Sequence, residues 1–243
     1  MEKVAAIILA AGKGKRMKAK GMNKVVFSLG KKQMILHAVD LLNSLSINPI
    51  VVVVGFAKKS VMDVLGNSVI YAEQKKRLGT GHAVNCALKK LDQNAENVLV
   101  LNGDDSAFYK KETIEKIIET HIEKNAVLSF LTITVENPTG LGRVIRDNND
   151  KVIGIVENKD ATEKQKKIKE INPACYIFEV DFLRKYLKQV KKSPVSGEYY
   201  LTSLINIAIE NKQKVEAVRG RKILWRGVNT PEELIEAERL LQI

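Results

Sequence analysis

The chain of 243 residues contains only two cysteines, Cys86 and Cys175. Two cysteines are too few for a disulfide framework or a zinc cluster, so a reducing cytoplasm is the expected location. No apolar run approaches the roughly 18 residues that a membrane span requires. The N-terminus also lacks the layout of a signal peptide, because Glu2 and Lys3 precede only a short apolar run that ends in glycines and lysines. The sequence therefore predicts a cytoplasmic protein with no membrane partner.

Aromatic residues make up only 5% of the chain, and they do not alternate with basic residues. Proteins that bind single-stranded nucleic acid use such aromatic side chains as stacking platforms. The formal net charge of +12 raises nucleic acid as a partner, but the lysines are scattered over the whole chain. We therefore expect a lysine-rich surface with part of its charge focused at an anion site, and no nucleic-acid partner.

The first glycine-rich segment of the chain follows an apolar run, Lys3 to Ala11, that is typical of a buried strand. Two glycines, Gly12 and Gly14, have no Cβ, so backbone N–H groups can approach phosphate oxygens closely. Three basic side chains stand within four residues: Lys13, Lys15 and Arg16. The segment predicts a polyphosphate site, and the alternative is a surface turn that happens to be basic.

Two familiar glycine-rich phosphate loops do not fit this segment. A P-loop requires Ser or Thr directly after its Gly-Lys pair, and neither follows the lysine at that spacing here. A dinucleotide-binding fingerprint requires a third glycine three residues after Gly14, where Met17 stands. The segment therefore belongs to another class of nucleotide loop.

The rest of the first half alternates between strand and helix patterns. Ile50 to Val54 and Val98 to Leu101 are uninterrupted apolar runs, which are typical of strands buried on both faces. Stretches with helical spacing, such as Lys111 to Lys124, follow these strands. Repeated units of this kind predict an α/β fold with a doubly wound, mostly parallel, Rossmann-like sheet.

The second half of the chain is richer in strand patterns. Arg143 to Arg146 and Val152 to Glu157 form a hairpin pattern around a cluster of turn residues, and Ile171 to Phe178 predicts one further strand. The length and composition fit one domain over residues 1–243. We expect a nucleotide-binding half, about residues 1–125, and a β-rich half, about residues 126–243, that binds something else.

Ligands of such sheets bind beyond the carboxyl ends of the strands, and two loops there carry unusual chemistry. The turn from Leu78 to His82 offers backbone N–H groups and the Thr80 hydroxyl to a base or a phosphate, with an ordinary helix start as the alternative. The segment from Asn102 to Asp105 places carboxylates directly after a buried strand. A carboxylate there can hold Mg²⁺ together with phosphate oxygens, and an Asx-type turn is the alternative.

The motifs of the chain, read together, resemble one enzyme family. They stand in this order: Leu9-Ala10-Ala11-Gly12-x-Gly14-x-Arg16-Met17, Lys24-Val25, Glu73-Gln74, Leu78-Gly79-Thr80-Gly81-His82-Ala83, Gly103-Asp104, Gly142-Arg143-Val144, Ile155-Val156-Glu157, Glu170-Ile171-Asn172, Gly197-Glu198-Tyr199-Tyr200-Leu201-Thr202 and Gly227-Val228-Asn229. In this order they resemble the sugar-phosphate nucleotidyltransferases over essentially the whole chain. Within that family the likeness is to the uridyltransferase domain of bacterial N-acetylglucosamine-1-phosphate uridyltransferases.

The resemblance implies a reaction of UTP with a sugar 1-phosphate that yields a UDP-sugar and pyrophosphate, with N-acetylglucosamine 1-phosphate as the expected sugar and Mg²⁺ as cofactor. It implies that Arg16 and Lys24 act on the phosphates and that Asp104 and Asn229 bind the metal. The implied nucleotide-binding residues are Leu9, Ala10, Ala11, Gly12, Gly14, Gln74, Gly79, Thr80, Asn102 and Gly103. The implied sugar-binding residues are Gly142, Glu157 and Asn172. Asp105 is the second candidate for a metal ligand on its chemistry alone.

The chain departs from the family pattern at several positions. Lys15 stands where the family usually has Thr, Asn23 where a Pro normally precedes the lysine, and Ser203 where Asp is common. Pro173-Ala174 follows Asn172, where the acetylglucosamine enzymes usually have Thr-Gly. The sugar could therefore be glucose, an N-acetylhexosamine or another hexose. The sequence also has no hexapeptide-repeat β-helix, so the acetyltransferase activity of the bifunctional enzymes is expected to be absent.

Two other functions compete with this interpretation. The cytidylyltransferases of isoprenoid synthesis have a similar length and opening loop, but Gln74 and the turn at Leu78 to Gly81 speak against that class. A non-catalytic module that senses nucleotide sugars is the second alternative. A sensor has no need to keep Asp104 and Asn229 together, so the pair favours an enzyme.

Overall fold

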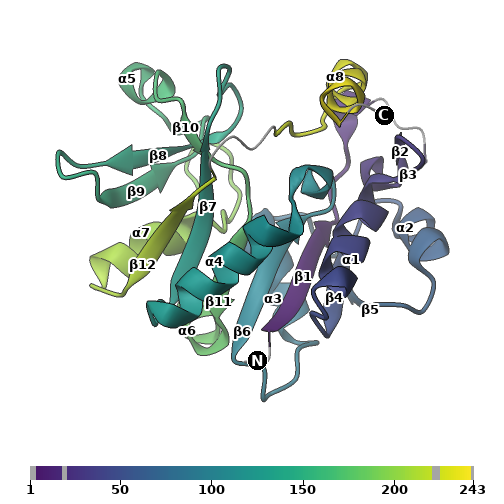
Figure 1. Ribbon diagram of the computed structural model, residues 1–243, viewed down its shortest axis with the longest axis horizontal. Helices are drawn as coiled ribbons and strands as arrows, with labels where there is room; N and C mark the ends of the chain where they lie inside the picture. Colours follow the sequence, from purple (N-terminus) through teal and green to yellow (C-terminus); the bar gives the residue numbers. More distant parts are fainter. Residues whose placement is uncertain (1–3, 18–20, 221–224, 242–243) are drawn as a thin grey trace.

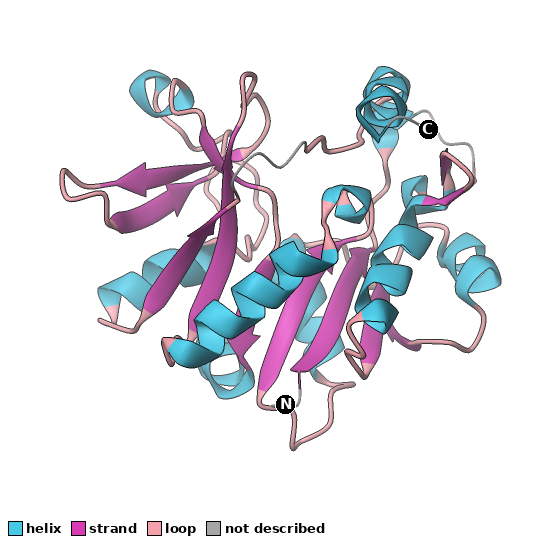
Figure 2. Ribbon diagram, in the orientation of Figure 1, coloured by secondary structure: helices cyan, strands magenta, loops and turns pink. Residues whose placement is uncertain are grey.

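The computed structural model describes residues 4–17, 21–220 and 225–241. One large sheet of ten strands runs through the molecule, and helices cover both of its faces (Figures 1 and 2). This arrangement confirms the predicted α/β class. None of the helices in the described residues has the length and apolar character needed to cross a membrane.

The first half of the sheet is parallel and has the strand order β5-β4-β1-β6. Its strands are β1 (Val4–Ala10), β4 (Ile50–Val54), β5 (Ile70–Glu73) and β6 (Asn97–Asn102). Its helices are α1 (Met34–Ser44), α2 (Lys58–Leu65), α3 (Thr80–Leu88) and α4 (Lys111–Glu123). A small separate ribbon pairs β2 (Ser28–Leu29) with β3 (Lys32–Gln33). All five residues of β4 are buried, as expected for a strand covered on both faces.

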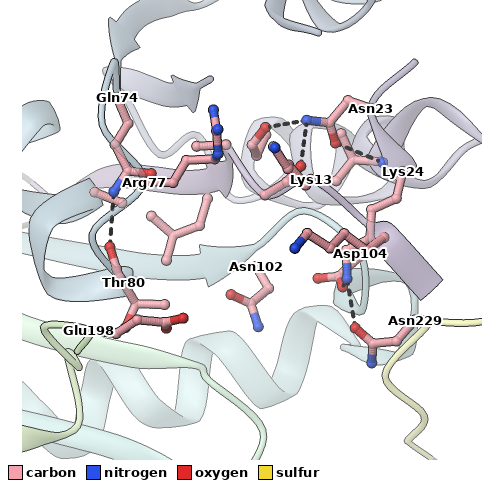
Figure 3. Close-up of a pocket in the computed structure, with 18 residues that line it drawn as sticks. Lys13, Asn23, Lys24, Gln74, Arg77, Thr80, Asn102, Asp104, Glu198 and Asn229 are labelled. Carbon is pink, nitrogen blue, oxygen red and sulfur yellow. Dashed lines mark hydrogen bonds and ion pairs between the residues drawn. The ribbon is translucent and has the colours of Figure 1, made fainter. Parts of the chain in front are cut away.

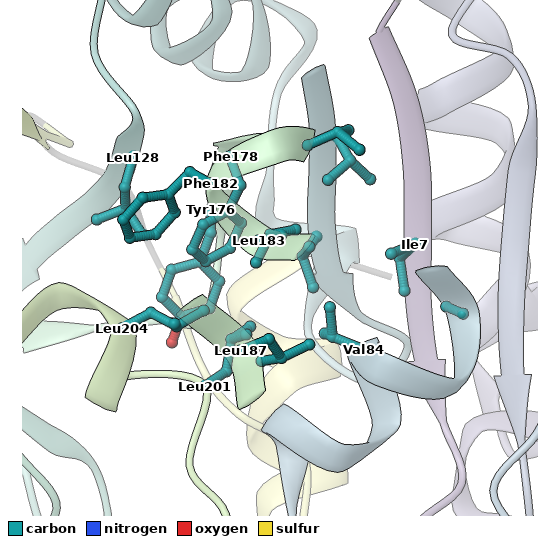
Figure 4. Packing of buried hydrophobic residues seen from close by; sticks show 14 of the residues in the cluster. Ile7, Val84, Leu128, Tyr176, Phe178, Phe182, Leu183, Leu187, Leu201 and Leu204 are labelled. Atoms are coloured by element: carbon teal, nitrogen blue, oxygen red, sulfur yellow. The ribbon is translucent and has the colours of Figure 1, made fainter. Parts of the chain in front are cut away.

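The two faces of this sheet carry separate hydrophobic cores, because successive side chains of a strand point to opposite sides. Ile7 of β1 packs in one core with Val84 of α3, and the same core contains the aromatic side chains Phe178 and Phe182 (Figure 4). Ile8, the next residue of β1, packs in the other core with residues of α1, α2 and α4. The chain thus winds over both faces of the sheet, as the alternating pattern predicted.

The second half extends the same sheet with mostly antiparallel pairings. Its strands are β7 (Leu128–Thr134), β8 (Gly142–Arg146), β9 (Val152–Val156), β10 (Glu170–Asn172), β11 (Tyr176–Glu179) and β12 (Val215–Arg219). Its helices are α5 (Glu163–Lys166), α6 (Val180–Tyr186), α7 (Ser203–Glu210) and α8 (Pro231–Leu241). Strand β11 joins the two halves by pairing with β6 on one side and β7 on the other, and β12 runs parallel to β7.

The prediction of one strand over Ile171 to Phe178 is wrong, because the chain divides it into β10 and β11. Pro173 has no N–H to give to a ladder, and Ala174 has a φ of +60° in the left-handed region. The turn sends β10 to pair with β7 and β8, while β11 pairs with β6 and β7. The Pro-Ala pair therefore moves the chain from the outer hairpin region to the centre of the sheet.

We expect Ala174→Gly to raise the free energy of unfolding by about 0.5–1 kcal/mol. The substitution relieves the strain of alanine in the left-handed region, and this gain exceeds the loss from the greater conformational entropy of glycine in the unfolded chain. Gly140→Ala is the matched control, because Gly140 has a φ of +82° and open space around its missing Cβ. That control should lower stability. Urea unfolding checks both variants, and a loss of stability in Ala174→Gly would contradict this account of the turn.

The last helix returns to the first half of the molecule. The backbone N–H of Glu233 donates to the hydroxyl of Thr230 at 3.2 Å, which caps the start of α8. Ala237 of α8 is fully buried in a third core that also contains Met17 and Phe108. This packing places the segment before α8, including Asn229, against the loops of the first half.

Candidate active site

A cavity of about 590 Å³ lies beyond the carboxyl ends of β1, β5 and β6 (Figure 3). Its lining includes eleven of the residues that the sequence predicted: Leu9, Ala10, Ala11, Gly12, Lys24, Gln74, Gly79, Thr80, Asn102, Asp104 and Asn229. Gly14, Arg16 and Gly103 are not part of this lining, and neither are the predicted sugar-binding residues. The predicted nucleotide and metal residues therefore come together largely in one place, although the sequence separates them by up to 220 positions.

The glycine-rich loop brings the basic side chains of the segment to the cavity. Gly14 has a φ of +55°, and a Cβ there would lie 2.8 Å from Cβ of Lys24, so the close approach of the two residues requires glycine. Four cationic residues line the cavity, against the two carboxylates of Asp104 and Glu198; they are Lys13, Lys15, Lys24 and Arg77. The excess of positive charge suits a polyanion. Arg16 is exposed on the short turn Lys15–Met17 beside this cavity.

Lys24 lies between the two predicted metal ligands. Its Nζ forms an ion pair with Asp104 and donates to Oδ1 of Asn229 at 2.8 Å and to the carbonyl of Val228 at 3.2 Å (Figure 3). The oxygens of Asp104 and Asn229 thus converge on a single positive centre. One carboxylate and one amide oxygen that converge in this way, beside space for phosphate oxygens, fit the ligands that Mg²⁺ takes.

Asp105, the second candidate for a metal ligand, lies in the core instead. It is 2% exposed, and within the described residues its Oδ1 has no hydrogen-bond partner. Burial, together with the adjacent carboxylate of Asp104, raises the pKa of Asp105 well above its ordinary value. Of the two neighbouring carboxylates, Asp104 is the one that lines the cavity. The described residues hold no cluster of three or more metal-binding side chains of the His, Cys, Asp or Glu type.

Gln74 is buried at the opposite end of the cavity from the Lys24–Asp104 pair (Figure 3). Its Nε2 donates to the carbonyl of Gly79 at 2.9 Å and lies 3.0 Å from Nδ1 of His82. A carbonyl oxygen only accepts, so the contact with Gly79 settles which end of the amide is nitrogen. In the described part of the chain, Oε1 of Gln74 accepts no hydrogen bond, and it is the end available to a ligand.

The turn at Leu78 to Gly81 is bonded to the loop before α7. The N–H of Tyr199 donates to Leu78 at 2.7 Å, and its carbonyl accepts from Gly81 at 2.8 Å. A Cβ on Gly79 would lie 2.5 Å from this carbonyl, so the contact requires glycine. The Thr80 hydroxyl, which the sequence predicted to contact a ligand, accepts a hydrogen bond from the N–H of Leu201 at 2.9 Å. This bond uses part of its hydrogen-bonding capacity. These bonds fix the turn and carry Glu198 to the cavity.

The three predicted sugar-binding residues lie together on the β8–β9–β10 part of the sheet. Gly142 pairs directly with Asn172 across β8 and β10, and a Cβ on Gly142 would lie 3.7 Å from the carboxylate oxygens of Glu157. Oε1 of Glu157 accepts from the Thr202 hydroxyl at 2.6 Å, and burial raises the pKa of Glu157. Asn172 accepts from the Ala174 N–H, and within the described residues its buried Nδ2 has no partner. The carboxylate of Glu157 and the unused amide donor of Asn172 thus flank Gly142 on its two sides.

The cavity also contains residues that were not assigned to it from the sequence. The additional lining residues are Lys13, Lys15, Asn23, Val25, Arg77, Ala83 and Glu198. Lys13 and Lys15 belong to the basic loop already singled out. Arg77 ends the basic stretch Lys75-Lys76-Arg77, which stands between Gln74 and Gly79. Because both of these neighbours are predicted nucleotide contacts, the position of Arg77 could have identified it from the sequence as a residue of the cavity.

Residues 5–242 match the nucleotidyl transferase family. The bifunctional protein GlmU of Caldicellulosiruptor saccharolyticus is 43% identical over 240 residues, which cover 98% of this chain and 51% of that protein. GlmU of Exiguobacterium sibiricum is 42% identical over 234 residues, covering 96% of this chain and 52% of that protein. The chain therefore spans about half the length of these curated relatives.

The fold also matches a solved structure. A putative glucose-1-phosphate thymidylyltransferase from Bacillus anthracis, crystallised with sucrose, superposes with a TM-score of 0.81 at 22% identity. The match covers 98% of this chain and 94% of that one, and at this identity it supports the fold alone. The family match over residues 5–242 and the GlmU relatives confirm the resemblance that the motifs indicated. The chain belongs to the nucleotidyl transferase family.

Proposed function

We propose that this protein is a uridyltransferase that makes a UDP-sugar and pyrophosphate from UTP and a hexose 1-phosphate, with N-acetylglucosamine 1-phosphate as the expected sugar. One observation carries the proposal. A single cavity holds a base-reading group, Gln74, at one end and a convergent cation site, Lys24 with Asp104 and Asn229, at the other. Because these two groups lie at opposite ends of the cavity, a nucleoside triphosphate can bind with its base at Gln74 and its phosphates at the cation site. The similarity to the GlmU proteins supports N-acetylglucosamine 1-phosphate as the sugar substrate.

The two halves of the chain divide the substrates between them in this proposal. Residues 1–125 supply most of the nucleotide site and residues 126–243 bind the sugar phosphate within the same domain, while Glu198 and Asn229 of the second half also line the nucleotide cavity. The pairing of β11 with both β6 and β7 makes the sheet continuous across the boundary. A rigid sheet of this kind holds two substrates in a fixed relation, which favours reaction through proximity and orientation.

The reaction requires charge neutralisation more than a strong base. An oxygen of the sugar 1-phosphate attacks the α-phosphorus of UTP, the bond from that phosphorus to the bridging oxygen breaks, and pyrophosphate leaves with the electron pair. The sugar phosphate is already ionised, so no side chain has to remove a proton. Arg16 and Lys24 place positive charge on the phosphates. Mg²⁺, when held by Asp104 and Asn229, adds charge that offsets the phosphate oxygens.

The sugar is bound in this proposal by Gly142, Glu157 and Asn172. The Glu157 carboxylate accepts hydrogen bonds from sugar hydroxyls, and the unused Nδ2 of Asn172 donates one. Gly142 keeps the space beside Glu157 open. A buried donor without a partner costs free energy until a ligand supplies an acceptor, which supports a ligand at this place.

Pyrophosphate release, measured with UTP, dTTP, CTP, ATP and GTP and a panel of sugar 1-phosphates, tests the proposed function. We expect release only with a uridine- or thymidine-type nucleotide combined with a hexose 1-phosphate. A preference for CTP with a non-sugar phosphate would support a cytidylyltransferase instead. Nucleotide-sugar binding without any turnover would support the sensing module.

Discrimination between sugars is expected to be modest. Pro173 removes a backbone N–H from the sugar end, and Ala174 carries a Cβ at a left-handed position. We expect kcat/KM for N-acetylglucosamine 1-phosphate to lie within about tenfold, or ~1.4 kcal/mol, of the value for glucose 1-phosphate. Steady-state kinetics with both sugars checks this. A preference above roughly a hundredfold in either direction would show that these two residues do not loosen the pocket.

A further inference from the structure

Asn23 occupies a fully buried position between the glycine-rich loop and the site's lysine. Its Nδ2 lies 2.8 Å from the carbonyl of Ala10, 3.2 Å from that of Gly12 and 2.9 Å from that of Phe56. Ala10 ends β1, Gly12 opens the basic loop, and Phe56 follows β4. Three carbonyls at the edge of the sheet where the cavity lies therefore share the two N–H donors of one amide group.

The remaining polar atoms of Asn23 are also engaged. Its Oδ1 accepts from the N–H of Val25 at 3.2 Å, and its own N–H donates to the hydroxyl of Ser60 at 3.0 Å. The first of these bonds caps the short turn Lys24–Val26. The side chain that anchors the glycine-rich loop thus also fixes the direction in which Lys24 leaves the backbone.

The orientation of these carbonyls matters for an anion. A peptide carbonyl directed at a phosphate repels it, whereas a backbone N–H attracts it. Ala10, Gly12 and Lys24 all line the cavity, and the Asn23 amide holds the carbonyls of the first two toward itself. Among the described residues, the N–H groups of Gly12 and Lys13 make no other hydrogen bond, so they remain available to the ligand.

We propose that Asn23 is a positioning residue of the triphosphate site, which holds carbonyls of the glycine-rich loop away from the phosphates and aligns Lys24 with them. This inference rests on the proposed function. It assigns Asn23 an effect on nucleotide binding and almost none on the sugar, because its contacts all belong to the first half of the chain.

The test replaces Asn23 by Asp, which keeps the shape and removes both N–H donors. Asn206→Asp is the matched control, because Asn206 also binds backbone groups through its amide, accepting from the Ile155 N–H at 2.9 Å and donating to the Ile155 carbonyl at 3.1 Å. Calorimetry measures the Kd for UTP, steady-state kinetics measures KM for each substrate, and thermal unfolding measures Tm. Asn23→Ala, which introduces no buried charge, carries the same test if Asn23→Asp does not fold.

We expect the Asn23 variant to weaken UTP binding and raise KM for UTP by about tenfold or more, with KM for the sugar phosphate changed by less than about threefold. The Asn206 variant should lower Tm with an unchanged Kd for UTP. An Asn23 variant that loses Tm but keeps the wild-type Kd would overturn the inference and leave the proposed function standing. A wild-type protein that neither binds UTP nor releases pyrophosphate would refute both.

Discussion

Replacing Asp104 by asparagine is expected to lower kcat by about 10² or more, the scale seen when one charge-stabilising group is lost from a reacting centre. The substitution keeps the size and shape of the side chain. It removes the negative charge that pairs with Lys24 and that, in our proposal, binds Mg²⁺. Pyrophosphate release at increasing Mg²⁺ concentration measures the effect, and we also expect the variant to need more metal.

Asp105→Asn is the matched control for this experiment. The two carboxylates are neighbours in the chain, but Asp105 is buried and does not line the cavity. Its replacement should leave kcat and the metal requirement much closer to wild type than Asp104→Asn does. Full activity of the Asp104 variant, or wild-type activity unchanged by excess EDTA, would remove the metal from the mechanism.

Preference for UTP over CTP is the second large effect that we expect. The amide nitrogen of Gln74 is engaged with Gly79 and His82, so its Oε1 is left to accept from the base. Uracil has an imide N–H that can donate to this oxygen, whereas the corresponding cytosine nitrogen is itself an acceptor. A mismatch of this kind costs about 1–3 kcal/mol, which corresponds to roughly 5- to 150-fold in kcat/KM.

Kinetics with the two nucleotides at a fixed concentration of sugar phosphate measures this ratio. The same measurement on Gln74→Ala isolates the contribution of the amide to base selection. Without the amide, the ratio of kcat/KM for UTP to that for CTP should fall toward one. Equal use of CTP by the wild type would assign base selection to other residues. A clear preference for CTP would revive the cytidylyltransferase interpretation.

The parallel half of the sheet could be predicted well from the sequence, because local residue patterns mark its strands. A run such as Ile50 to Val54 has no polar face, so only a strand covered on both sides accommodates it. The hairpin of β8 and β9 was equally visible, because its turn residues stand between two alternating segments. Given parallel strands, the position of the site at their carboxyl ends followed from the fold class.

The parts that could not be predicted depend on contacts between distant residues. The break between β10 and β11 reflects which neighbours the chain meets after Pro173, and no local pattern specifies those partners. The position of Lys24 between Asp104 and Asn229 could not be predicted from a local pattern. Asn229 is 205 positions from Lys24 in the sequence, and the packing of α8 places it. Nor does the sequence show that the amide nitrogen of Gln74 donates to the carbonyl of Gly79, which leaves only the amide oxygen for a base.

A crystal structure of the protein with Mg²⁺ and UDP-N-acetylglucosamine tests the central claim most directly, because it locates base, metal and sugar in one measurement. Our account predicts uracil beside Oε1 of Gln74, the metal between Asp104 and Asn229 with Lys24 displaced from between them onto the phosphates, and the sugar against Glu157 and Asn172. A nucleotide bound outside the cavity, or a sugar directed away from the β8–β10 strands, would contradict it.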